Sequence, residues 1–237
     1  MKNYSFFKTT LFLFIVCLTM FSSSLVLGQE QQKFRINLQT GLALPYGQLA
    51  SKLYKSGGYA VYGRNSSVEG IWQFNPQLAA GVSFSALKFP FDDNTYARDL
   101  LKSDVFMDFV YMKSDTYDVL TYTAAIYYTR SVFKKLSLTG NLGGGMIWVQ
   151  TPDQLFSATY FAGKQSTYKI TPSRDTKPAM TYGLSCHYQL FPHVDVSLDA
   201  KYYFAKMGFG FNTSTYSYTK RLTFSYLSAG FGINLLF

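Results

Sequence analysis

The sequence predicts an all-β protein, an eight-stranded antiparallel up-and-down transmembrane β-barrel. Three observations predict this fold: apolar and polar residues alternate over eight segments, no charged residue lies on the apolar faces of these segments, and short breaks alternate with long ones. A period of two indicates a strand with one face toward lipid and the other toward a lumen. A Lys or Arg in the middle of a lipid-facing side costs about 2 to 4 kcal/mol, so a bilayer excludes it.

The last strand shows the alternation most clearly. Its outward positions are Leu227, Ala229, Phe231, Ile233, Leu235 and Phe237. Eleven residues rising about 3.3 Å each at a tilt near 45° span roughly 25 Å, the height of the apolar band of such a barrel. The segment resembles the final strand of bacterial outer-membrane barrels. That resemblance implies that Phe237 is an assembly signal and that the outer-membrane assembly machinery is a partner.

Residues 1–28 are predicted to be a signal peptide, which leaves residues 29–237 as the barrel domain. Lys2 and Lys8 precede an apolar run at 11–21, and small or β-branched residues lead to Gly28. An uncleaved membrane helix is the alternative, but the run is shorter than the roughly 20 residues that a helical span needs.

Seven further segments alternate in the same way as the last one. We expect them to be strands at 34–44, 68–74, 78–86, 120–128, 136–148, 180–188 and 194–204. Short turns are expected near 75, 132 and 192, and long loops at 45–60, 91–116, 150–177 and 205–220. An even strand number places both termini on the periplasmic side. A soluble β-sandwich or lipocalin-like barrel is the alternative, but it would not need charge-free outer faces.

The charge balance fits an exported membrane protein. The chain has 22 Lys and Arg against 13 Asp and Glu, and 19% of its residues are aromatic. Aromatic residues form the interfacial girdles of membrane barrels. An exported basic chain encounters anionic lipid headgroups and lipopolysaccharide phosphates, so we expect these partners and no nucleic acid.

Four parts of the sequence resemble the OmpA/OmpX-like outer-membrane β-barrel domain family. They are the stretch 41–47, the Gly57-Gly-Tyr59 approach to the second strand, the Asn75-Pro76 turn and the glycine-rich stretch 136–145. The resemblance covers the barrel domain and implies its fold. The peptidoglycan-binding domain of longer relatives is not found after the barrel, which disfavours a role in cell-wall anchoring.

Alternation also predicts which side chains face the lumen. Among them Arg35, Glu69, Asp199 and Lys201 are expected to form an internal network of salt bridges. Eight-stranded barrels are just wide enough for side chains to fill, and charges away from bulk water need partners. The network would then close the lumen. The alternative is a narrow gated pore in which these pairs break.

The sequence predicts no catalytic, cofactor or metal site. His187 is followed by Tyr-Gln and His193 by Val-Asp, so the His-x-Ser arrangement of outer-membrane lipid A deacylases is missing. Two separated histidines are too few for a metal centre. Asp92-Asp93-Asn94 lacks the spacing of an EF-hand calcium loop.

The second long loop contains the strongest candidate for a contact site. Residues 105–112 are too apolar for a solvated loop, and Phe106 and Phe109 are the predicted contact patch for an envelope or surface protein. The same segment would also suit an extension of the following strand or a cap over the barrel mouth. A short helix is expected at 95–102, and this acidic loop is expected to meet the basic first loop.

These observations favour a non-enzymatic outer-membrane barrel whose extracellular loops bind a surface partner or stabilise the lipopolysaccharide layer. The alternatives are a passive pore for small solutes and a subunit of a larger envelope complex.

Overall fold

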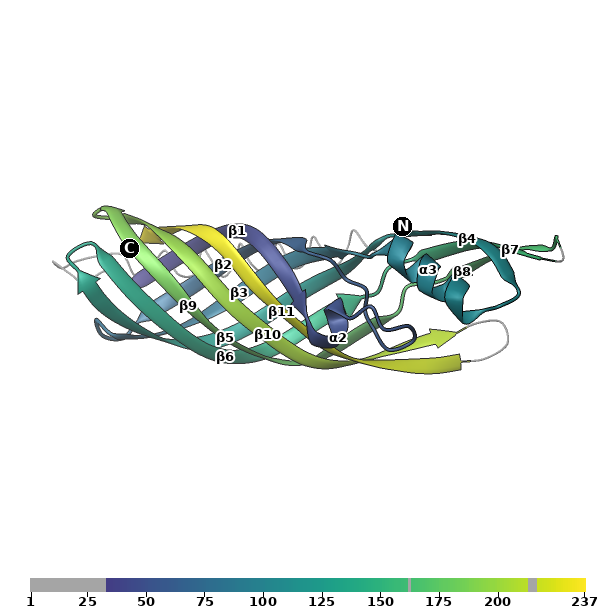
Figure 1. Cartoon of the computed structure of the whole chain (residues 1–237). Coiled ribbons are helices and arrows are strands. Elements are labelled where there is room, and N and C mark those ends of the chain that lie inside the picture. Colours follow the sequence, from purple (N-terminus) through teal and green to yellow (C-terminus); the bar gives the residue numbers. More distant parts are fainter. Residues whose placement is uncertain (1–32, 162, 213–216) are drawn as a thin grey trace, which may run out of the picture. The chain divides into compact units, whose positions relative to one another are not determined.

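The structure is a computed structural model that describes residues 33–161, 163–212 and 217–237 (Figure 1). The predicted signal peptide, 1–28, lies outside the described residues. The barrel strands are β1 (Phe34–Tyr46), β2 (Gly63–Gln73), β3 (Leu78–Pro90), β5 (Thr116–Phe133), β6 (Leu136–Gln150), β9 (Arg174–Phe191), β10 (Val194–Asn212) and β11 (Ser217–Leu236).

These eight strands form one closed antiparallel ring in the order β1-β11-β10-β9-β6-β5-β3-β2. The first and last strands close it: Phe34 and Phe237 exchange backbone hydrogen bonds of 3.1 and 2.8 Å. A closed ring leaves no strand edge exposed to hydrocarbon, where an unpaired backbone group costs several kcal/mol. The predicted fold class is therefore confirmed.

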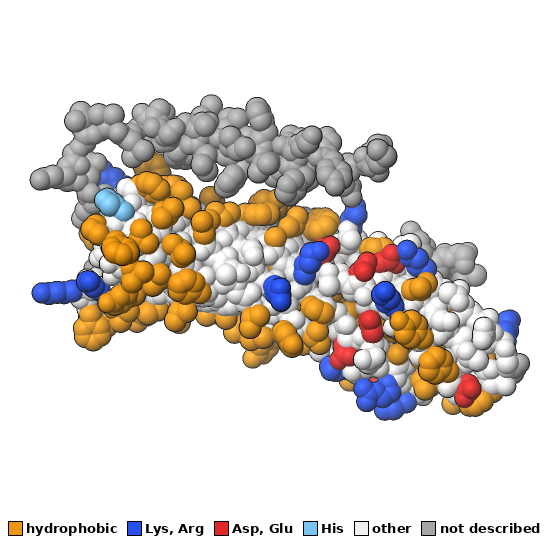
Figure 2. Space-filling view, turned by 90° about the horizontal axis from the view of Figure 1, so that it is seen from above, with side chains coloured by type: hydrophobic (Ala, Val, Ile, Leu, Met, Phe, Trp, Pro, Cys, Tyr) orange, Lys and Arg blue, Asp and Glu red, His pale blue; other side chains and the backbone are white. Residues whose placement is uncertain are grey.

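The predicted alternation holds in every barrel strand. On β1, Leu38 is exposed and Asn37 is buried, and on β10, Leu198 is exposed while Asp199 is buried. On the face drawn in Figure 2, hydrophobic side chains are spread along the outer wall of the barrel, as a lipid-facing surface requires.

Short turns join the strands at one end of the barrel. At the β2–β3 turn the Asn75 side-chain oxygen accepts hydrogen bonds from the backbone N–H groups of Gln77 and Leu78, at 2.9 and 2.8 Å. The side chain of Asn75, the first residue of the Asn-Pro turn, therefore stabilises the turn.

At the opposite end the strands are longer than a membrane requires. β10 has 19 residues and β11 has 20, and about 19 residues near 45° rise roughly 45 Å. The expected long loop at 205–220 is therefore wrong, because both strands continue through most of it as a hairpin. The outward apolar positions end near Phe204, but the strands continue beyond it with apolar side chains facing inward.

The barrel wall divides between β9 and β10 at this end. Their pairing stops at Ala179 and Ala205, although β9 stays paired with β6 and β10 with β11. Pro178 comes directly before Ala179 on β9 and has no N–H to donate. The Asp175 carboxylate instead accepts a 2.7 Å hydrogen bond from the Gly208 N–H.

A second sheet lies on the long-loop side. Its strands are β4 (Met107–Ser114), β7 (Gln154–Tyr160) and β8 (Gln165–Ile170), in the order β4-β7-β8, and we call it the outer sheet. The loops also contain α2 (Gly47–Ala50) and α3 (Asp93–Ser103), and the latter confirms the helix expected at 95–102. In the described part of the chain, neither helix is long and apolar enough to cross a membrane.

The role of Phe237 in assembly stays a prediction. Its ring centroid lies 6.4 Å from that of Phe34, across the pairing that closes the ring. We expect Phe237→Ser to lower the membrane-inserted fraction of the protein while processing of the signal peptide continues. The measurement is the fraction that migrates differently in unboiled and boiled detergent samples. Unchanged insertion would show that Phe237 is no assembly signal.

Candidate functional site

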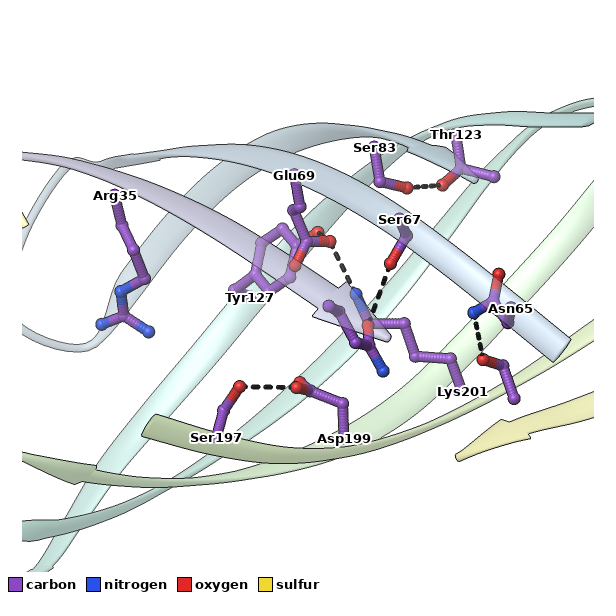
Figure 3. A network of polar contacts seen from close by, with 12 residues as sticks. Arg35, Asn65, Ser67, Glu69, Ser83, Thr123, Tyr127, Ser197, Asp199 and Lys201 are labelled. Atoms are coloured by element: carbon purple, nitrogen blue, oxygen red, sulfur yellow. Dashed lines mark hydrogen bonds and ion pairs between the residues drawn. The ribbon is translucent and has the colours of Figure 1, made fainter. Parts of the chain in front are cut away.

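The interior of the barrel contains a buried ion pair. Lys201 on β10 and Glu69 on β2 face each other across the lumen, with 2.7 Å between Lys201 Nζ and Glu69 Oε1 (Figure 3). Their residues are only 6% and 4% exposed. The Tyr127 hydroxyl donates a further hydrogen bond to the same carboxylate oxygen. The pair therefore joins two strands that lie three places apart in the ring, with each charge neutralised by its partner.

A glycine provides the space that Lys201 needs. A β-carbon at Gly183 on β9 would lie 2.8 Å from Lys201 Cγ and 2.6 Å from the Ala200 carbonyl oxygen. Any larger residue would displace the lysine stem. The glycine at position 183 is visible in the sequence, but only the strand register shows that it accommodates the side chain of Lys201.

The four predicted network residues do not form one cluster. Asp199 accepts a 2.6 Å hydrogen bond from the Ser197 hydroxyl. Arg35 lies apart from the Glu69–Lys201 pair (Figure 3), with its Nη1 atom 3.5 Å from His187 Nε2. The network is therefore a central ion pair with separate polar contacts around it.

Beyond this polar zone, toward the long loops, the interior is apolar. We call the buried cluster there the apolar plug. It consists of Ala43, Leu49, Ala60, Leu87, Phe89, Tyr117, Val119, Ile147, Val149, Ala179, Tyr203, Ala205, Met207, Phe209, Leu222, Phe224 and Tyr226. The sequence analysis does not predict this apolar interior. Most of the plug lies on parts of the strands beyond the limits that the sequence predicts for them.

The first loop covers the plug. Leu49 of α2 and Ala60 both belong to the cluster, and the Tyr117 hydroxyl donates a 2.8 Å hydrogen bond to the Gly58 carbonyl oxygen. Lys220 Nζ donates to the Gly57 carbonyl oxygen at 2.7 Å, and burial lowers the pKa of this amine. The cap over the mouth therefore comes from the first loop.

Residues 105–112 occupy neither of the two structural positions suggested by the sequence, an extension of the following strand and a cap over the barrel mouth. They neither extend β5 nor cap the mouth, because most of them form β4 of the outer sheet. Met107 and Val110 pack with Ala158 of β7 against the apolar side chains of α3. The sequence predicts a loop at 150–177, where the partner strands lie, and so it gives no indication of this sheet.

Two aspartates attach α3 to its surroundings. Asp92 caps the helix by accepting the Thr95 N–H at 3.1 Å, and it forms a 2.6 Å ion pair with Lys52 of the first loop. Burial alone would raise the pKa of Asp92, but the Lys52 ammonium and the Thr95 donors hold it below its ordinary value. Asp93 accepts from the Ser114 N–H at 3.1 Å and from its hydroxyl. The acidic second loop thus meets the basic first loop, as expected.

The outer sheet presents apolar side chains to solvent. Phe106 is 73% exposed and Phe109 is 59% exposed. Phe161 is equally open, and its N–H donates to the Phe106 carbonyl oxygen at 3.1 Å, which brings the two residues together at the tip. We call this surface the apolar patch. Its members are Val105, Phe106, Phe109, Tyr111 and Phe161.

Comparison with known proteins supports the fold. No family model matches the chain, and no curated protein matches it. A major outer membrane protein from Thermus thermophilus has a TM-score of 0.50 and 11% identity, over 86% of this chain and 99% of that one. The chain has the fold of the outer-membrane β-barrels. At this identity the likeness concerns fold alone, and the expected resemblance to OmpA/OmpX-like barrels is confirmed at that level.

Two further solved structures resemble the chain more loosely. The outer membrane protein AlkL has a TM-score of 0.48 at 14% identity, over 90% of this chain and 93% of that one. Neisserial surface protein A has a TM-score of 0.47 at 13% identity, over 86% and 97%.

The buried ion pair gives a testable prediction. We expect Lys201→Met to lower the free energy of unfolding by about 3 to 5 kcal/mol, because it leaves Glu69 charged and unpaired in the barrel interior. The double variant Lys201→Met with Glu69→Gln should recover most of this loss. Urea unfolding in detergent or liposomes is measured for Lys201→Met, for Glu69→Gln and for the double variant. If the two single effects simply added in the double variant, the charges would not be coupled.

Proposed function

We propose that this chain is a non-enzymatic barrel of the outer membrane of a Gram-negative bacterium and binds a surface protein through its outer sheet. The apolar patch carries this proposal. Exposed apolar clusters of this kind mark interaction sites in soluble regions of proteins. The patch lies on a sheet with its own small core beneath α3, so it can contact a partner without disturbing the barrel.

The orientation that suits this function has the short turns toward the periplasm and the outer sheet outside the cell. The strands support it, because the extensions and all three outer-sheet strands lie at the same end. In this orientation both ends of the barrel domain face the periplasm, where the outer-membrane assembly machinery would receive Phe237.

A second observation supports contact with lipopolysaccharide. Arg64 on β2 and Lys88 on β3 are directly opposite one another and exposed on the outer wall at the long-loop end. Like charges in this position repel, and Asp118 neutralises only Lys88, at 3.4 Å. A lipopolysaccharide phosphate would supply the missing negative charge. We therefore propose that the barrel also stabilises the lipopolysaccharide layer.

The passive pore is the weaker proposal. A solute would have to cross both the Glu69–Lys201 pair and the apolar plug, which the first loop covers. Membership of a larger envelope complex is compatible with the apolar patch. Purification of the protein alone in mild detergent would argue against that alternative.

The patch is tested by replacing Phe106 and Phe109 together with Ser. Burial of each ring in a partner contributes about 1.5 to 3 kcal/mol, so the loss of both should weaken a complex roughly a hundredfold or more. Pull-down from whole envelopes and heat resistance in detergent are measured in parallel. We expect binding to fall and heat resistance to stay unchanged.

The matched control replaces Leu53 and Tyr62 together with Ser. Both are exposed apolar residues between β1 and β2. An equal loss of binding in this control would mean that general loop polarity matters and not the patch. Reduced heat resistance in the Phe106 and Phe109 variant would return these residues to an architectural role.

Conductance tests the pore alternative directly. We expect single-channel recordings of the reconstituted protein to show no steady conductance, because the apolar plug excludes water and ions from the long-loop half of the lumen. A stable open level at neutral pH would favour the pore.

A further inference from the structure

The short-turn end of the barrel is basic on its outer surface. Arg130, Lys134 and Lys135 lie within six residues at the β5–β6 hairpin, and all three side chains are exposed. Within the described residues none of the three forms an ion pair. The positive charge of this hairpin is therefore available to an external anion.

No exposed acidic side chain of the described residues lies at this end. The nearest acids, Glu69, Asp195 and Asp199, are all buried and face the lumen. The other described aspartates belong to the long-loop end, between 92 and 118 or at Asp153 and Asp175. Among the described side chains the charge is thus separated: exposed side chains of both signs lie at the long-loop end, and exposed cationic side chains without an exposed acidic one lie at the short-turn end.

The same hairpin carries an aromatic side chain suited to a membrane interface. The β5–β6 register shifts between Ser131 and Phe133, and the bulge exposes Val132 and Phe133 in succession. Phe133 is 71% exposed. Bulges commonly redirect side chains in this way.

Neighbouring outward aromatics place this hairpin at the level of the lipid headgroups. Tyr128 precedes it on β5, and Tyr188 on β9 is opposite Leu136, which follows the turn. Girdles of exposed aromatic residues mark the interfaces of membrane barrels. The hairpin is also held in place, since the Gln189 N–H donates a 2.9 Å hydrogen bond to the Lys135 carbonyl oxygen.

We propose that the β5–β6 hairpin binds the phosphate of an anionic phospholipid in the leaflet on the short-turn side. Phe133 enters the boundary between headgroups and acyl chains, and Arg130, Lys134 and Lys135 surround the phosphate. A zwitterionic lipid carries a cationic group beside its phosphate and would bind less well. This site is separate from the apolar patch and does not depend on the function proposed for it.

The test measures lipid selectivity in bilayers. The full barrel is reconstituted in nanodiscs of phosphatidylcholine with spin-labelled phosphatidylglycerol or spin-labelled phosphatidylcholine, and the protein-bound fraction of each probe is recorded. One cation near an anionic surface contributes about 1 kcal/mol, or about fivefold. We expect selectivity for phosphatidylglycerol to fall more than tenfold in the triple variant R130Q, K134Q and K135Q.

The control variant K102Q, K113Q and K164Q removes the same charge from exposed lysines of the long loops. It should keep the selectivity of the wild type. Heat-dependent migration confirms that both variants are folded. Equal binding of the two probes by the wild type, or an equal loss in both triple variants, would overturn the proposal.

A further arm separates a lipid site from a site for free phosphate. Inorganic phosphate is compared with chloride at the same ionic strength, so that general screening is identical. A lipid site should show the same selectivity in both salts. Loss of selectivity in phosphate alone would assign the hairpin to soluble phosphate and refute lipid recognition.

Discussion

Closure of the backbone hydrogen-bond ring is the constraint on which the rest of this structure depends. In hydrocarbon each unpaired N–H or C=O costs several kcal/mol, so the strands must pair on both sides and β1 must meet β11. Closure fixes the side-chain parity of all eight strands at once. If the pairing register of β1 shifted by one residue, Asn37 would take the outward position of Leu38. Every apolar side chain of β1 would then face inward and every polar one outward.

The same alternation of side chains gives the barrel a polar interior where lipid surrounds it and an apolar interior in the strand extensions beyond the membrane. Where lipid surrounds the wall, outward residues are apolar and the lumen contains Glu69 and Lys201. On the extensions, outward residues include Lys206 and Arg221, whereas Phe209 and Leu222 face inward. Water now surrounds the wall, and the strands follow the rule of a soluble barrel with an apolar core. One ring therefore combines a membrane protein and a soluble one, and the apolar plug is the core of the second.

How far the sequence determines this structure depends on the range of the interactions. The parity of β1 and β11 follows from neighbouring residues, and so the lipid face is predictable. The pairing of β4 with β7 joins residues 40 to 53 positions apart, and no local pattern indicates that partner. Lys201 can be placed in the lumen, but its pairing with Glu69 depends on the register of four strands and on the space at Gly183. Residues 105–112 stand out in the sequence because their apolar character conflicts with a loop.

The division of the barrel into zones also separates its candidate contacts with the surroundings. The ion pair crosses the middle of the lumen and the plug closes its long-loop half, so the barrel has little free internal surface there with which to act. Interaction is left to the two ends, where the chemistry differs: exposed aromatics on a separate sheet at one end, and cations beside Phe133 at the other. Because the outer sheet has its own core beneath α3, its exposed face can vary without affecting ring closure. The β5–β6 hairpin has no such independence, since its backbone is part of the ring, and its side chains are therefore held at a fixed depth relative to the lipid headgroups.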